Sequence, residues 1–272
     1  MKLVLKKGIT SMISIDHNAY SSRLREIDPV IKIVSALIVL FISLYANSYL
    51  VSIVIIFTIN LTIVKYGGTK LKLLLGLMLL PISFLILSVI TIIIQSSASQ
   101  SNLLLPIRIS HLYYGLNLDS LNFVGRLIFR AIAAISCMYF IALTTPMTEV
   151  FSALRRLRLP KLVIELMELI YRFIFILKET ANQIYIAQSS RLGYNSLSAS
   201  YKSLGILTSM LFDRGYKRSD KVYIALESRG YDGELNIIDS EYDKSYKYYL
   251  YSGTFITMLI IIYLLERLVL VW

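Results

Sequence analysis

The sequence has 272 residues, of which 56% are hydrophobic and only 17% are charged, and its mean hydropathy is +0.66. Soluble domains usually carry roughly 25% charged residues, so this composition excludes an ordinary water-soluble enzyme as well as a disordered chain. Lysine and arginine outnumber aspartate and glutamate by 28 to 17, which gives a net charge of +11. A membrane protein with basic loops accounts for both properties.

Five apolar stretches predict transmembrane helices, because about 20 apolar residues are needed to cross a bilayer core. They are residues 30–46, 49–64, 73–94, 123–143 and 248–265. The polar pair Asn47-Ser48 predicts a tight turn between the first two, and Pro81 interrupts the third. Arg126 and Arg130 lie one turn apart near the start of the fourth. A charge inside a span is a functional candidate, but we expect these two side chains to reach the headgroups or an acidic neighbour.

The basic residues in short loops predict the orientation of the chain in the membrane. Five lie within the first 29 residues and three more between the second and third spans; they are Lys2, Lys6, Lys7, Arg23, Arg25, Lys65, Lys70 and Lys72. The opposite loops hold only Arg108. We therefore expect a cytoplasmic N-terminus in the plasma membrane of a prokaryote and, with five spans, an external C-terminus. The first 29 residues contain no apolar core typical of a cleavable signal.

Between residues 146 and 244 the pattern changes to three amphipathic helices, predicted at 146–157, 161–191 and 198–229. We keep the third as one helix although Gly215 could bend it. The predicted architecture is an all-α polytopic membrane protein in three regions. Residues 1–145 form the N-terminal segment and four spans, residues 146–244 a cytoplasmic coupling module, and residues 245–272 the last span.

The two longer amphipathic helices end alike, with Ser190-Arg191-Leu192 followed by Gly193-Tyr194, and with Ser228-Arg229-Gly230 followed by Tyr231. Each motif alone is typical of a helix C-terminus, where glycine and a cation are both favoured. Their repetition, 38 residues apart from Arg191 to Arg229, also suits two projecting arginines that dock into equivalent sites on a symmetric partner.

No residue pattern indicates catalysis, a cofactor or a metal site. The phosphate-binding motif Gly-x-x-x-x-Gly-Lys-Ser/Thr is absent from the sequence, and the predicted spans contain no aspartate or glutamate before Glu266. His17, His111 and Cys137 are too far apart to support a metal claim by spacing. We therefore expect a non-catalytic protein that depends on partners.

Several separated motifs resemble, in order, those of one known family. Near the N-terminus these are residues 15–24, with sequence IDHNAYSSRL, followed by Asp28-Pro29 and a span. Residues 144–160, then Glu165-Leu166 and Tyr171-Arg172, resemble the central signature of the family. The stretch ESRGYDG at residues 227–233 resembles its closing motif. Together these motifs resemble the cobalt-type transmembrane (T) component of energy-coupling factor transporters, the CbiQ group.

The resemblance implies a scaffold between a substrate-capture membrane subunit and two ATP-binding-cassette ATPases. It implies that Ser190-Arg191-Leu192 and Ser228-Arg229-Gly230 each insert into an ATPase groove. The first motif departs from the family pattern at Leu192, with its glycine displaced to Gly193, and this leaves its geometry open. The implied function is ATP-driven cobalt or nickel uptake, connected with cobalamin biosynthesis. The 14 basic and 12 acidic side chains of residues 146–244 nearly balance, which argues against a nucleic-acid partner.

Two alternatives stay open at this point. The chain could be a T component shared among vitamin-type capture subunits, or it could be a polytopic lipid-modifying enzyme whose cytoplasmic helices bind headgroups. The second alternative predicts activity from the purified chain alone and tolerance of changes at Arg191 and Arg229.

Overall fold

The computed structural model describes residues 16, 18–97, 104–109, 112–116, 118–232 and 246–271, and every structural statement below refers to these residues. Within these ranges the side chains are also described, except those of residue 90, residues 92–122 and residues 269–271. The sequence predictions on His17, His111 and Gly233, and on the basic residues Lys2, Lys6 and Lys7, lie outside the described residues, as does the side chain of Arg108.

The described chain is mainly helical, which confirms the predicted all-α membrane fold. Eight α-helices and one short 3-10 helix cover most of these residues. They are η1 (Arg23–Glu26), α2 (Pro29–Ala46), α3 (Tyr49–Lys65), α4 (Leu71–Ile93), α5 (Leu118–Thr144), α6 (Met147–Arg156), α7 (Lys161–Ser190), α8 (Leu197–Glu227) and α9 (Tyr246–Val271).

Side-chain caps fix the starts of the first two long helices. Asp28 precedes α2 and accepts a hydrogen bond from the backbone N–H of Val30 at 3.0 Å, and Pro29 occupies the first turn, where its missing N–H costs nothing. Ser48 caps α3 in the same way through the N–H of Val51. Asn47 takes a left-handed conformation with φ of 44°, which makes the tight turn predicted between the two helices.

Four of the described helices are long and apolar enough to cross a membrane, so the chain is a multi-pass membrane protein. The qualifying segments are Pro29–Ala46, Leu71–Val89, Phe123–Thr144 and Tyr246–Leu268. The remaining predicted span corresponds to α3, an apolar helix of 17 residues. The α4 helix continues through Pro81, which lies in its interior.

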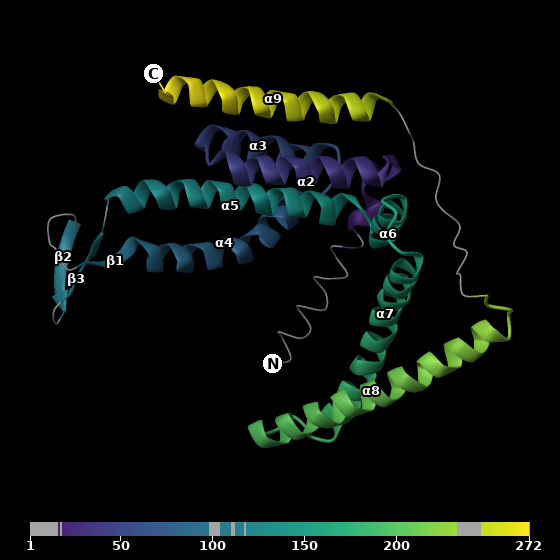
Figure 1. Cartoon of the computed structure of the whole chain (residues 1–272). Coiled ribbons are helices and arrows are strands. Elements are labelled where there is room, and N and C mark those ends of the chain that lie inside the picture. The colour runs from purple at the N-terminus through teal and green to yellow at the C-terminus, as the bar shows by residue number, and fades with distance from the viewer. Residues whose placement is uncertain are drawn as a thin grey trace. The chain divides into compact units, whose positions relative to one another are not determined.

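A small antiparallel sheet, absent from the sequence prediction, connects α4 to α5. Its strands β1 (Ile94–Ser97), β2 (Leu104–Ile109) and β3 (Leu112–Leu116) are arranged in the order β1-β3-β2. Ile94 pairs with Leu116 at one end of the β1–β3 ladder, and Ile109 pairs with Leu112 at one end of the β2–β3 ladder. Figure 1 shows this sheet beyond the ends of α4 and α5.

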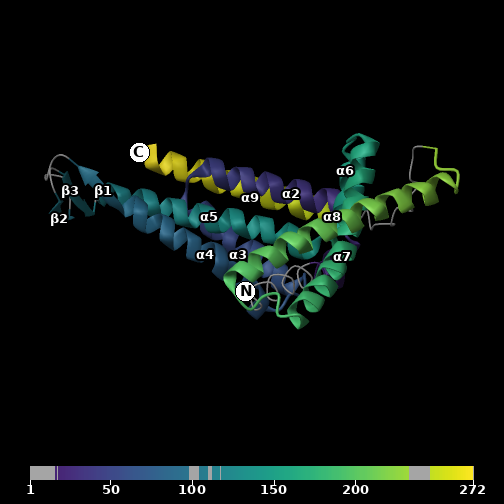
Figure 2. The same ribbon diagram turned by 90° about the horizontal axis from the view of Figure 1, so that it is seen from below.

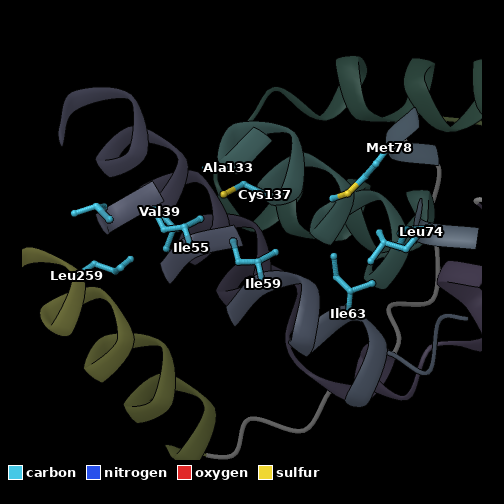
Figure 3. Packing of buried hydrophobic residues seen from close by; sticks show 11 residues of the cluster. Val39, Ile55, Ile59, Ile63, Leu74, Met78, Ala133, Cys137 and Leu259 are labelled. Carbon is cyan, nitrogen blue, oxygen red and sulfur yellow. The ribbon is translucent and has the colours of Figure 1, made fainter. Parts of the chain in front are cut away.

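The chain divides into two compact units, one made of residues 1–150 and 241–272 and the other of residues 151–240. In the first unit, α2, α3, α4, α5 and α9 pack around one apolar core. Its buried members are Val39, Val51, Ile55, Ile59, Ile63, Leu74, Met78, Ala133, Cys137, Leu143 and Leu259. Figure 3 shows most of these side chains meeting between the helices, with Cys137 beside Ala133 on α5.

The second unit consists of the end of α6 and the two long helices α7 and α8, which cross each other (Figures 1 and 2). The half-buried face of α8 carries Leu204, Leu207, Leu211, Gly215, Val222 and Leu226. A Cβ added at Gly215 would lie 3.6 Å from Leu177 of α7, so the glycine lies against its neighbour at ordinary packing distance. The α8 helix runs unbroken through Gly215, as predicted.

Candidate functional site

The backbone at the end of α7 forms a compact cap over residues 188–193, here called the α7 cap. The N–H of Gly193 donates to the carbonyl of Gln188 at 2.9 Å, and the N–H of Leu192 donates to that of Ser189 at 3.1 Å. These two bonds define a Schellman motif, in which the residue after the helix takes a left-handed conformation. That residue is Leu192, with φ of 58°.

The end of α8 forms the same cap over residues 226–231, here called the α8 cap. The N–H of Tyr231 donates to the carbonyl of Leu226 at 3.0 Å, and the N–H of Gly230 donates to that of Glu227 at 3.0 Å. Gly230 is the left-handed residue, with φ of 76°. Leu192 therefore corresponds to Gly230, and Gly193, the displaced glycine of the sequence comparison, corresponds to Tyr231.

Arg191 and Arg229 occupy equivalent positions, each directly before the left-handed residue. Both side chains are exposed, and neither guanidinium has a salt-bridge partner among the described residues. The structure does not bring the two arginines together. Gly193, two residues after Arg191, contacts α8 at Ser203, and Arg229 follows the end of α8. Roughly 40 Å of helix, at 1.5 Å per residue, therefore separates the two arginines.

A polar network fixes the α7 cap against α8. The Ser203 hydroxyl donates to the carbonyl of Gly193 at 2.7 Å, and the Gln188 amide donates to the carbonyl of Ser203 at 3.0 Å. The Tyr194 hydroxyl donates to the Gln188 side-chain oxygen at 2.7 Å, and burial raises the pKa of Tyr194, so this donor stays protonated. A Cβ on Gly193 would lie 2.7 Å from the Ser203 hydroxyl, so only glycine fits between the cap and α8.

The α8 cap is held in a different way. The Tyr231 hydroxyl donates to a carboxylate oxygen of Glu165 at 3.3 Å. Glu165 is buried in the second turn of α7, so this bond ties the end of α8 back to the start of α7. Both caps are therefore stabilised by a tyrosine that follows the arginine closely in sequence.

In the first unit the structure brings together three charged side chains that the sequence patterns did not connect. Lys32 on α2 donates to Glu149 on α6 at 3.3 Å, and to the backbone carbonyls of Leu24 and Thr144. Arg25 on η1 approaches the second carboxylate oxygen of Glu149 at 3.2 Å. The Lys32 and Glu149 side chains are only 4% and 5% exposed, so their charges are almost removed from solvent.

Glu149 thus interacts with two cations, but burial has the larger effect on the pKa of its carboxyl group. Burial raises the pKa of Glu149 above its ordinary value of 4.5, while the charges of Lys32 and Arg25 act in the opposite direction. A buried ion pair whose attraction does not fully offset desolvation contributes little net stability, although loss of one partner is costly. The arrangement therefore specifies where the first turn of α6 lies against α2 and η1.

The described residues line a cavity but offer no cluster that suits a metal ion. No group of three histidine, cysteine, aspartate or glutamate side chains within this part of the chain could hold a metal ion. A cavity of about 520 Å³ lies between α2, α3, α5 and α9, with mostly apolar walls that include Val39, Phe140 and Phe255. Lys32 reaches its wall, but its ammonium donates to the three acceptors described above.

Comparison with known proteins identifies the family. The profile of the CbiQ family, described as cobalt transport protein, matches residues 20–238. The chain belongs to the CbiQ family. An uncharacterized protein of Methanocaldococcus jannaschii is 32% identical over 254 residues, which cover 93% of each chain. The cobalt transport protein CbiQ of Salmonella typhimurium is 31% identical over 160 residues, covering 59% of this chain and 71% of its own.

A third relative is the putative fused cobalt transport protein CbiMQ of Methanocorpusculum labreanum, 34% identical over 134 residues. The match covers 49% of this chain and 22% of that protein. The CbiQ profile extends over both caps and the Lys32–Glu149 pair, because all of them lie between residues 20 and 238. This CbiQ-family chain is accordingly a membrane component of a transporter.

Proposed function

We propose that this CbiQ-family chain is the transmembrane coupling subunit of an energy-coupling factor importer for cobalt or nickel. Two ATP-binding-cassette ATPases bind the α7 cap and the α8 cap, and a substrate-capture membrane subunit binds a separate surface. The observation that carries the proposal is the repeated cap, in which two long helices of one unit end with the same hydrogen bonds and an exposed arginine.

Arginine suits this role because its planar guanidinium forms paired, charge-assisted hydrogen bonds that the lysine ammonium does not reproduce. In the proposed mechanism, ATP binding closes the ATPase pair and moves the two docked helix ends relative to each other. The α7–α8 unit transmits this motion to the membrane helices. The chain itself carries out no reaction, and ATP hydrolysis takes place on the partner subunits.

An aromatic row on α8 supports an additional partner of apolar character. Tyr201, Phe212, Tyr216 and Tyr223 are all exposed, and their spacings of 11, 4 and 7 residues place them on one helix face. We assign this face to the substrate-capture subunit. The names of the Salmonella and Methanocorpusculum relatives, both cobalt transport proteins, support cobalt as the transported ion. Uptake of radioactive cobalt, nickel and vitamins by cells that express the complete transporter distinguishes the metal from the vitamin-type alternative.

The decisive experiment is affinity purification of the tagged full-length chain in mild detergent. We expect the wild-type chain to bring down two ATPase subunits and a small membrane protein, and the Arg191→Glu/Arg229→Glu variant to lose the ATPases while still inserting into the membrane. A control variant, Arg214→Glu/Arg218→Glu, makes the same charge change at exposed arginines within α8 and should retain the ATPase subunits. Stoichiometric ATPase on the Arg191→Glu/Arg229→Glu variant would contradict the proposal.

The proposal includes a cytoplasmic N-terminus, which the basic residues at the start of the sequence support. After Cys137→Ala, single cysteines are placed at the exposed positions Ser21 and Asn47, which lie before and after α2. A membrane-impermeant thiol reagent added to intact cells should label the cysteine at position 47 and not the one at position 21. The opposite labelling would reverse the orientation.

A further inference from the structure

The two caps differ at the one position where the backbone is left-handed. Glycine adopts this conformation without steric cost, as Gly230 does in the α8 cap, whereas a leucine side chain collides with its own backbone carbonyl. Leu192 nevertheless takes φ of 58° in the α7 cap. The residue is 71% exposed, so burial within this chain does not compensate for the strain.

The surroundings of Leu192 hold it in place. The carbonyl of Gly193 accepts from Ser203, and Gln188 is bonded to both Ser203 and Tyr194, so the backbone on either side of Leu192 is anchored to α8. An apolar side chain is thus presented next to the exposed Arg191, on a backbone that needs no rearrangement before binding. In the α8 cap the corresponding space is empty, since no atom lies within 4 Å of a Cβ added at Gly230.

We propose that Leu192 is a specificity-determining side chain that enters an apolar pocket beside the groove for Arg191 on one ATPase subunit. This inference rests on the proposed function. The α7 cap then binds through a cation and a hydrophobic anchor, whereas the α8 cap binds through Arg229 alone. The two docking sites are consequently unequal, and the α7 cap selects an ATPase whose surface combines a polar groove with an adjacent apolar pocket.

The test measures the affinity of the full-length chain, in detergent, for the nucleotide-free ATPase dimer that co-purifies with it. Leu192→Asn removes the hydrophobic anchor but keeps the cap, because asparagine tolerates the left-handed conformation. We expect binding about tenfold weaker or more, from the lost burial of a leucine side chain. Gly230→Asn places the same residue at the equivalent position of the α8 cap and should change the dissociation constant less than twofold.

The outcomes separate this inference from the proposed function. An unchanged dissociation constant for Leu192→Asn, together with lost binding for Arg191→Ala/Arg229→Ala, would overturn the role of Leu192 and leave the docking proposal intact. Equal weakening by Gly230→Asn, or a lower unfolding temperature of Leu192→Asn than of the wild type, would also overturn it. Undiminished ATPase binding by the double arginine variant would instead refute the proposed function.

Discussion

The ammonium of Lys32 lies 3.3 Å from the carboxylate of Glu149, although the two residues are 117 positions apart in the sequence. Lys32 projects from the first turns of a membrane-spanning helix, and Glu149 belongs to the first turn of α6. With Arg25 on the other carboxylate oxygen, the pair joins η1, α2 and α6 through charge as well as packing.

Replacing one member of this pair should destabilise the protein more than replacing both. Lys32→Met leaves the buried Glu149 carboxylate without its buried counter-ion, and we expect a loss of about 3–5 kcal/mol. The Lys32→Met/Glu149→Leu variant, with apolar residues of similar volume, should recover most of that loss. Thermal unfolding can be followed with a thiol-reactive dye, because Cys137 is the only cysteine and is fully buried. A double variant as unstable as Lys32→Met would refute this account.

The raised pKa of Glu149 predicts a pH dependence of stability. As the pH rises above 4.5, the ordinary value of a glutamate carboxyl, the unfolded chain releases this proton before the folded chain does. The contribution of Glu149 is therefore fully present below that pH and is lost as the pH rises through the raised pKa. Calorimetry at a series of pH values should show the wild type losing stability relative to Lys32→Met/Glu149→Leu across this window. A relative gain would contradict the prediction.

Replacing glycine with alanine should have opposite effects on stability at Gly193 and at Gly205. Gly193→Ala would place a Cβ 2.7 Å from the Ser203 hydroxyl and 2.9 Å from the Gln188 carbonyl, so the α7 cap must shift, and we expect a loss of about 1–3 kcal/mol. Gly205→Ala lies in open space within α8 and should stabilise by about 1 kcal/mol. If the unfolding midpoints of both variants move in the same direction, close packing at the α7 cap does not determine the effect of alanine on stability.

The bond between Tyr231 and Glu165 should determine how firmly the end of α8 is held. Tyr231→Phe removes the hydroxyl donor, and a single hydrogen bond to a charged group contributes about 1.5–3 kcal/mol. We expect faster amide hydrogen exchange over residues 224–231 and unchanged exchange over residues 200–210. Tyr223→Phe, at an exposed tyrosine of the same helix, serves as the control and should change neither segment.

The sequence predicted the long helices well because each is specified by local information. Apolar run length defines the spans, and capping residues such as Asp28 and Ser48 define where helices begin. The small sheet was not predicted, because its strands are short and β2 contains Pro106, which is unusual inside a strand.

Contacts between distant residues were the second kind of feature that the sequence did not reveal. The pairing of Lys32 with Glu149 leaves no local pattern, since it depends on how α2 and α6 pack. The geometry of the α7 cap also required the structure. The displaced glycine left the geometry of this helix end open. In the structure Leu192 accepts the strained conformation, and Gly193 is required for close contact with Ser203.

The Tyr231–Glu165 bond makes α7 and α8 a closed loop, since the chain connects the end of α7 to the start of α8 and this bond connects the end of α8 to the start of α7. The first turns of α7 are therefore connected to the end of α8 in two ways, along the two helices and through the Tyr231 hydroxyl. We expect a frame that is closed at both ends to bend less than two helices joined at one end only.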